Sequence, residues 1–193
     1  MNGACPLAAA RSYHRIVTGS NSSATPPGSH PDSGPPYLIV SFANTLSPGP
    51  EKTDLLRTRE EAAGWLHTAA LLPAEAGLSN SEHAALLRLR GSIRDVLTAH
   101  TEGREDADAA ARLTKALADG RLVITVGPAS TVKLASAARA SYPSLVAAVA
   151  GAVADSAAAG TWLRLRSCAA PHCGQAFYDS ASSASTRCPA HAA

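Results

Sequence analysis

The last 26 residues of the chain, Cys168–Ala193, read CAAPHCGQAFYDSASSASTRCPAHAA. Three of the four cysteines lie here, and a histidine follows the last of them in the pattern Cys168-x4-Cys173-x14-Cys188-x2-His191. Two close pairs of Cys or His ligands separated by a loop are typical of structural zinc sites, because each tight turn presents two ligands to one ion. The spacing therefore predicts Zn2+ bound by Cys168, Cys173, Cys188 and His191.

Two questions stay open within this stretch. His172, next to Cys173, competes with His191 as the fourth ligand. The cysteines could instead be buried thiols, or two of them could form a disulfide. Gly174 follows the second cysteine, where a ligand-bearing turn often needs a residue that tolerates positive φ. Four protein ligands leave no open position for water or substrate, so the predicted site is structural and the protein is not expected to be an enzyme.

Composition restricts the rest of the chain. Its 193 residues are enough for one ordinary domain and a small addition. Hydrophobic residues make up 46%, aromatic residues only 4%, and alanine is common, which predicts a helix-rich body packed by Ala and Leu. The net charge of +2 does not by itself indicate nucleic-acid binding. We see no membrane span and no secretion signal, so we expect a cytoplasmic protein, in which clustered thiols bind metal more often than they form disulfides.

The N-terminal part divides into a tail and the start of the fold. Residues 1–36 are rich in Gly, Ser and Pro and are expected to be disordered, with Cys5 as a free thiol. The apolar run Tyr37–Phe42 predicts a short buried strand. Asn44 and Thr45 follow it and are candidates for the mouth of a ligand pocket. The alternative is that Asn44 only turns the chain or caps its neighbour.

Capping boxes and apolar periodicity predict the helices. Thr58 and Ser79 each precede a glutamate by three residues, which is the signature of a helix N-terminus. Further helices are expected over about 106–119 and 144–158, and a β-hairpin over 122–126 and 131–134. On the helix that follows Ser79, the arginines are expected to form a solvated face rather than an anion site: Arg88, Arg90 and Arg94.

The segment that leads into Cys168 alternates. Leu163 and Leu165 are expected to face a core, with Trp162, Arg164 and Arg166 on the other side. Small zinc modules often present basic side chains to phosphates, and the arginines available near the cysteines are Arg164, Arg166 and Arg187.

Several of these motifs resemble a bacterial family that carries an N-terminal ABATE domain and a C-terminal CGNR zinc finger, proposed to be stress-induced transcription regulators. Residues 41–46 (SFANTL) look like its DFVNTL segment, and residues 89–94 (LRGSIR) are similar to its AR-x-LREAL helix. Asp54-Leu55-Leu56 with Trp65-Leu66 looks like the block between them. Residues 165–168, Cys173 and the triplet Phe177-Tyr178-Asp179 are similar to the start of the finger. The finger of this chain is shortened and divergent: the arginine-rich loop is Ser/Ala, His191 stands in the second ligand pair, and Gly-Asn-Arg is absent.

The resemblance implies an α+β, mostly helical protein: a helical N-terminal domain with a short strand and a β-hairpin, then a small zinc-finger module. It divides the chain into a tail (1–36), an ABATE-like sensor domain (37–160) and a CGNR-like finger (161–193). The implied function is a DNA-binding transcription regulator that responds to an unknown small-molecule effector, with a homodimer as an open option. The alternative is a ligand-binding or protein-interaction protein whose zinc module is purely structural.

Overall fold

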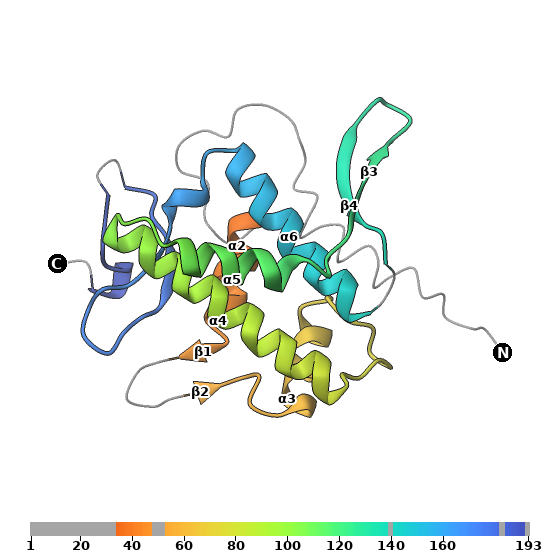
Figure 1. Ribbon diagram of the computed structural model, residues 1–193, viewed down its shortest axis with the longest axis horizontal. Helices are drawn as coiled ribbons and strands as arrows, with labels where there is room; N and C mark the ends of the chain where they lie inside the picture. Colours follow the sequence, from red (N-terminus) through yellow and green to blue (C-terminus); the bar gives the residue numbers. More distant parts are fainter. Residues whose placement is uncertain (1–33, 48–52, 139–140, 182–183, 192–193) are drawn as a thin grey trace.

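The computed structural model describes residues 34–47, 53–138, 141–181 and 184–191. The tail predicted over residues 1–36 lies outside the described residues up to Ser33, and so does Cys5. Helices dominate, and the strands form three separate two-stranded antiparallel sheets (Figure 1). The α+β, mostly helical class predicted from the sequence is confirmed. None of the described helices has the length and apolar character needed to cross a membrane.

The predicted strand over Tyr37–Phe42 is wrong, because these residues belong to helix α2 (Pro35–Ala43). Two prolines stand in its first turn, where their fixed φ suits a helix start and their missing N–H groups leave no bond unmade. Leu38, Ile39, Phe42 and Ala43 are buried, and this spacing follows a helical face. A continuous apolar run of six residues fits a buried helix as well as a buried strand.

The two capping boxes are confirmed. In α3 (Arg59–Thr68), the Thr58 hydroxyl accepts from the N–H of Glu61, and the Glu61 carboxylate accepts from the N–H of Thr58. The long α4 (Asn80–Glu102) starts in the same way from Ser79. It ends at Gly103, which adopts a left-handed conformation with φ of 63°.

The middle of the chain forms α5 (Ala107–Leu117), the hairpin of β3 (Leu122–Val126) and β4 (Val132–Ser136), and α6 (Tyr142–Ala158). The predicted hairpin is therefore confirmed, with Ile124 opposite Leu134. Helix α5 ends at Leu117, and Gly120 after it lies against α6, where a Cβ would be 2.7 Å from the backbone of Val146. Only glycine permits this close approach.

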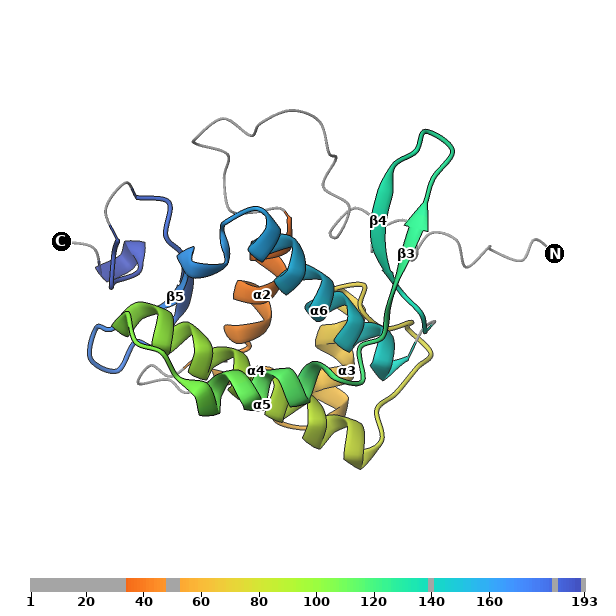
Figure 2. The ribbon, with the colours of Figure 1, turned by 45° about the horizontal axis from the view of Figure 1, so that its top comes forward.

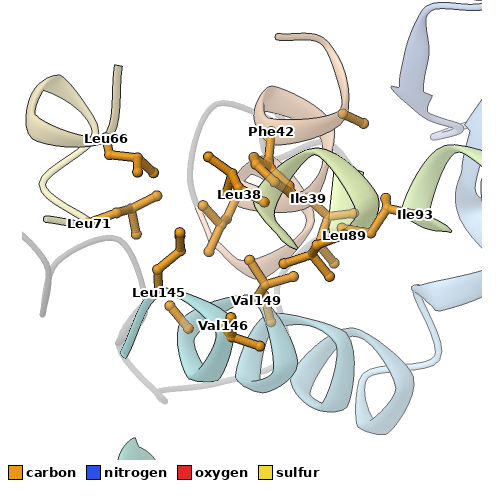
Figure 3. Close-up of a cluster of buried hydrophobic side chains, with 14 of the residues drawn as sticks. Leu38, Ile39, Phe42, Leu66, Leu71, Leu89, Ile93, Leu145, Val146 and Val149 are labelled. Atoms are coloured by element: carbon orange, nitrogen blue, oxygen red, sulfur yellow. The ribbon is translucent and has the colours of Figure 1, made fainter. Parts of the chain in front are cut away.

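The hydrophobic core lies between α2, α4 and α6 (Figure 3). Helix α2 is at its centre, covered by α4 on one side and α6 on the other (Figures 1 and 3). The fully buried side chains of this core include Ile39, Phe42, Leu89, Ile93, Leu145, Val146 and Val149. Trp65 of α3 packs against this core, with its ring 5.9 Å from that of Phe42, as expected for a core residue.

The C-terminal segment is attached to the same core. It contains a 3-10 turn, η1 (Trp162–Arg164), the paired strands β5 (Leu165–Ser167) and β6 (Ala176–Tyr178), and a final 3-10 turn, η2 (Pro189–His191). Leu165 and Ala176 are members of the main core cluster. The predicted alternation over 162–166 is only half right: Leu165 is buried, but the η1 turn leaves Leu163 66% exposed. The remaining short sheet pairs β1 (Leu46–Ser47) with β2 (Thr53–Asp54).

Candidate metal centre

Four side chains from two turns meet at one point in the C-terminal segment. The ligand atoms of Cys168, Cys173, Cys188 and His191 all lie within 4.8 Å of one another. Cys168 and Cys173 come from the β5–β6 connection, whereas Cys188 directly precedes η2 and His191 is its last residue. The three cysteines are free thiols in the structure, and the Sγ atoms of Cys173 and Cys188 are farther apart than in a disulfide bond.

Local backbone geometry positions the ligands. His172 and Gly174, on either side of Cys173, have φ values of 62° and 53°, so the predicted positive φ of Gly174 is confirmed. In the second pair, the N–H of His191 donates to the carbonyl of Cys188 at 2.8 Å, which closes a tight turn. His172 is exposed and is not part of the cluster, so the geometry favours His191 as the fourth ligand.

The distances between ligand atoms suit a tetrahedral metal ion. Zn–S bonds of about 2.3 Å at tetrahedral angles place two sulfurs about 3.8 Å apart. The Sγ atoms of Cys173 and Cys188 are 3.9 Å apart. His191 Nδ1 lies 3.8 Å from Cys168 Sγ and 3.2 Å from Cys188 Sγ. Three thiols and one imidazole nitrogen at these separations fit a divalent, thiophilic ion of the size of zinc.

Electrostatics at the cluster also favour a cation. Burial acts to raise the pKa of Cys168, but hydrogen bonds to its sulfur, first that from the N–H of Cys188, outweigh burial and lower the pKa to about 7. Burial and the neighbouring sulfurs raise the pKa of Cys173 to about 11. One thiol therefore ionises easily and hinders ionisation of the next. A bound cation removes this repulsion and converts thiols to thiolate ligands.

A small apolar cluster surrounds the ligands. Phe177 packs with Cys168, Ala170 and Cys188 and is the large apolar side chain of this cluster. Asp179, only 6% exposed, accepts from the N–H groups of Ala181 and Ser185 and so shapes the loop before Cys188.

The module is held on the helical body by Asn44 and Arg94. Asn44 caps the C-terminus of α2, and its amide donates to the carbonyl of Ala176 at 2.9 Å and accepts from the Ala176 N–H at 2.8 Å. Arg94 of α4 donates to the carbonyl of Gly174, next to Cys173, and to the carbonyl of Ala43 at the end of α2, both at 2.9 Å. Two side chains of the helical body thus hold the backbone that follows the second cysteine.

The end of α4 adds further attachments. The Thr101 hydroxyl donates to the carbonyl of Ser167 and accepts from its N–H, at 2.7 and 2.8 Å. His100 Nδ1 lies 2.9 Å from the carbonyl of Leu165. Both contacts hold β5 directly before Cys168. The candidate metal centre is therefore built onto the α2–α4 surface rather than joined to it by a free linker.

The expectation that the α4 arginines form a solvated face is right only for Arg88, which is exposed. Arg90 is 6% exposed and forms a bidentate ion pair with Asp54 of β2, in which Nη2 of Arg90 donates to Oδ2 of Asp54 at 2.9 Å. Arg94 is half-buried in the contacts described above. Arg90 and Arg94 lie beside the apolar face of α4. They are covered by segments that are distant in sequence, around Asp54 and Gly174, so the periodicity of α4 alone does not reveal their burial.

The three arginines predicted to contact phosphate have different environments. Arg187 and Arg164 are exposed. The Arg166 side chain is only 16% exposed, donates to the carbonyl of His100 at 3.1 Å, and lies 3.5 Å from the Asp179 carboxylate. The guanidinium of Arg166 is thus directed into the protein.

The residues predicted to line a pocket, Asn44 and Thr45, have protein partners. Thr45 is 1% exposed, and its hydroxyl donates to the carbonyl of Phe42 and accepts from Arg90. Asn44 is the C-cap residue of α2, in agreement with the alternative hypothesis from the sequence, and it also holds β6 through hydrogen bonds. An open cavity of about 570 Å³ lies instead between β2 and α3, where its lining includes Asp54 and Trp65.

A comparison with protein families identifies the family of this chain. A family model named ABATE, described as "Putative stress-induced transcription regulator", matches residues 37–160. No protein of known function in the curated set matches the chain. The matched range contains Asn44 and Arg94, whereas the four metal-ligand candidates follow it.

Proposed function

The chain belongs to the ABATE family, and on this basis together with its Cys3His cluster we propose that it is a cytoplasmic, DNA-binding transcription regulator with a structural zinc centre. The observation that carries the proposal is the closed set of four ligand atoms attached to the ABATE domain through Asn44 and Arg94. A closed set of ligands supports folding rather than catalysis, because no coordination position remains for a substrate.

Zinc would stabilise a segment that has little core of its own. Among the described residues of the module, one large apolar side chain, Phe177, joins the cysteines and Ala170 in its apolar cluster. In small zinc modules the free energy of metal binding is folding free energy, on the order of 10 kcal/mol. The ion would fix the turn that carries Cys188 and His191 against the turn that carries Cys168 and Cys173.

Metal analysis of two histidine variants tests the zinc centre. We expect one zinc ion per chain in the wild type and in His172→Ala, the matched control from the exposed side of the turn. His191→Ala should weaken zinc binding at least about 100-fold in competition with a chromophoric chelator, because it removes a side chain that would bind the ion directly. Wild-type affinity in His191→Ala, or its loss in His172→Ala, would reassign the fourth ligand.

DNA contact would use the exposed arginines next to the metal centre, Arg164 and Arg187. Arg166 supports this surface indirectly, since it joins α4 to the loop shaped by Asp179. With two exposed arginines, the electrostatic part of binding is small. We expect the logarithm of the affinity to fall with the logarithm of salt concentration with a slope of about −2 from these residues.

Fluorescence anisotropy with duplex DNA at several salt concentrations tests this surface. The double variant Arg164→Ala, Arg187→Ala should lose about two units of salt slope and bind more weakly than wild type. Arg88→Ala removes an exposed arginine from α4 and serves as the control. Equal binding by the double variant and the control, or no binding by the wild type at about 50 mM salt, would reject the DNA proposal.

The burial of Arg166 favours a second candidate function: a ligand-binding or protein-interaction role in which the zinc module is only structural. The cavity between β2 and α3 offers a place for a small-molecule effector. Asp54 lines this cavity and forms an ion pair with Arg90 of α4. The same helix carries Arg94, which contacts the zinc module. This function predicts zinc-dependent folding of residues 165–191 with no DNA affinity, so the two assays above separate the candidates.

A further inference from the structure

The β3–β4 hairpin extends away from the helices, and one face of its outer part is apolar, whereas Ser136 lies on the same face at the base. Figures 1 and 2 show it projecting at the opposite end of the molecule from the C-terminal segment. The register places Ile124 opposite Leu134 and Val126 opposite Val132. Directly paired residues share a face of the sheet and successive residues alternate, so these four side chains lie on one face.

This apolar face is exposed. The exposed fractions are 69% for Ile124, 70% for Val126, 66% for Val132 and 37% for Leu134. The base of the same face is covered, since Leu122 is half-buried and lies near Gly151 of α6. The apolar surface thus continues outward from the core beyond the point where α6 stops covering it.

The pattern of the strands indicates a partner. The opposite face carries Val123, Thr125, Lys133 and Ala135, so both polar side chains of the outer hairpin, Thr125 and Lys133, lie on that face, opposite one another. A two-stranded hairpin is marginally stable by itself in water and gains stability when an apolar face is covered. Contiguous apolar patches of this kind mark interaction sites.

We propose that the partner is a second copy of this chain, whose apolar hairpin face packs against this one around a two-fold axis. The strands contain one charged residue, Lys133, and the register places it on the opposite face. Two copies of the face can therefore meet without bringing like charges together, although the chain has a net charge of +2. A two-fold axis pairs each apolar position with another apolar position, so one surface serves both partners.

The available area sets the strength of the dimer. The four side chains expose on the order of 300 Å² per chain, so about 600 Å² would be buried from them in a dimer. This area lies below the roughly 1,000 Å² that a stable specific interface buries, so the contact belongs to the weak, transient class. An interface of this size gives a reversible dimer with a Kd in the micromolar range rather than an obligate one.

Sedimentation equilibrium of the full chain tests the proposal with two neighbouring substitutions. Val126→Lys places a charge on the apolar face, and Thr125→Lys places the same charge on the opposite face of the same strand. Both residues are exposed, so both variants should fold, and circular dichroism and metal content check this. Wild type and Thr125→Lys should approach twice the 19.6 kDa of one chain as concentration rises from about 1 to 300 μM.

Val126→Lys should weaken self-association at least about tenfold, because the two-fold axis brings the two lysines together in an apolar interface. Wild-type chains that remain monomeric throughout the concentration range would overturn the proposal, and another occupant would then cover the face. Equal weakening by both lysines, or by neither, would also overturn it. The metal centre lies at the other end of the molecule, so this result is independent of zinc and DNA binding (Figure 1).

Discussion

Replacement of Asn44 by alanine tests whether the helical body holds the metal module through specific hydrogen bonds. The Asn44 amide satisfies both backbone groups of Ala176, at 2.9 and 2.8 Å. Ala176 is only 3% exposed and belongs to the main core cluster. After the substitution, one buried N–H and one buried C=O lose their partners, and little water can reach them.

The expected loss of stability follows from these two groups. Leaving a buried backbone donor or acceptor unpaired costs about 1–3 kcal/mol. For both groups together, with some relaxation of β6, we expect the free energy of unfolding to fall by about 2–4 kcal/mol.

Urea denaturation of the zinc-loaded full chain measures this change, and chelator competition measures the linked change in zinc affinity. Coupling requires both to weaken, because β6 begins three residues after Cys173. Ser41→Ala is the matched control: it lies on the same helix, and its hydroxyl bonds only to the carbonyl of Leu38 one turn earlier. If Asn44→Ala changes stability by less than about 0.5 kcal/mol, as expected for Ser41→Ala, the anchoring role is refuted.

Two further predictions concern buried charge and pH. Asp54→Asn should destabilise the protein by about 3–5 kcal/mol in urea melts, because Arg90 is left buried without its counter-ion. Asp95→Asn breaks an exposed pair and should have a much smaller effect; comparable losses would contradict the argument. The hydrogen bond from Arg90 lowers the pKa of Asp54 below 3.8, so the stability it contributes is present above about pH 4 and is lost as pH falls through the lower, folded-state pKa. Burial lowers the pKa of His100 below 6.5, so stability should decrease as pH falls from about 7 through that lowered pKa. His100→Gln should flatten this part of the stability profile, and an unchanged profile would rule out His100 as its cause.

The sequence alone determined the features that depend on local chemistry. Ligand spacing predicted a metal cluster, and Cys168, Cys173, Cys188 and His191 do converge. Capping boxes at Thr58 and Ser79 and the turn composition of residues 127–130 predicted helix starts and a hairpin. In each case the residues that decide the structure are close in sequence, so the backbone geometry follows from them with little help from distant contacts.

Tertiary structure decided the elements whose environment comes from elsewhere in the chain. The run Tyr37–Phe42 is largely apolar and fits a strand or a buried helix equally well. In the structure it forms helix α2, which packs against both α4 and α6. Arg90 and Arg94 occupy positions that are polar in a helical pattern, yet β2 and the metal turn cover them. Asn44 bonds to Ala176 across 132 residues of sequence. Periodicity reports which face of an element is apolar, whereas burial of a polar side chain depends on which distant backbone groups pack next to it.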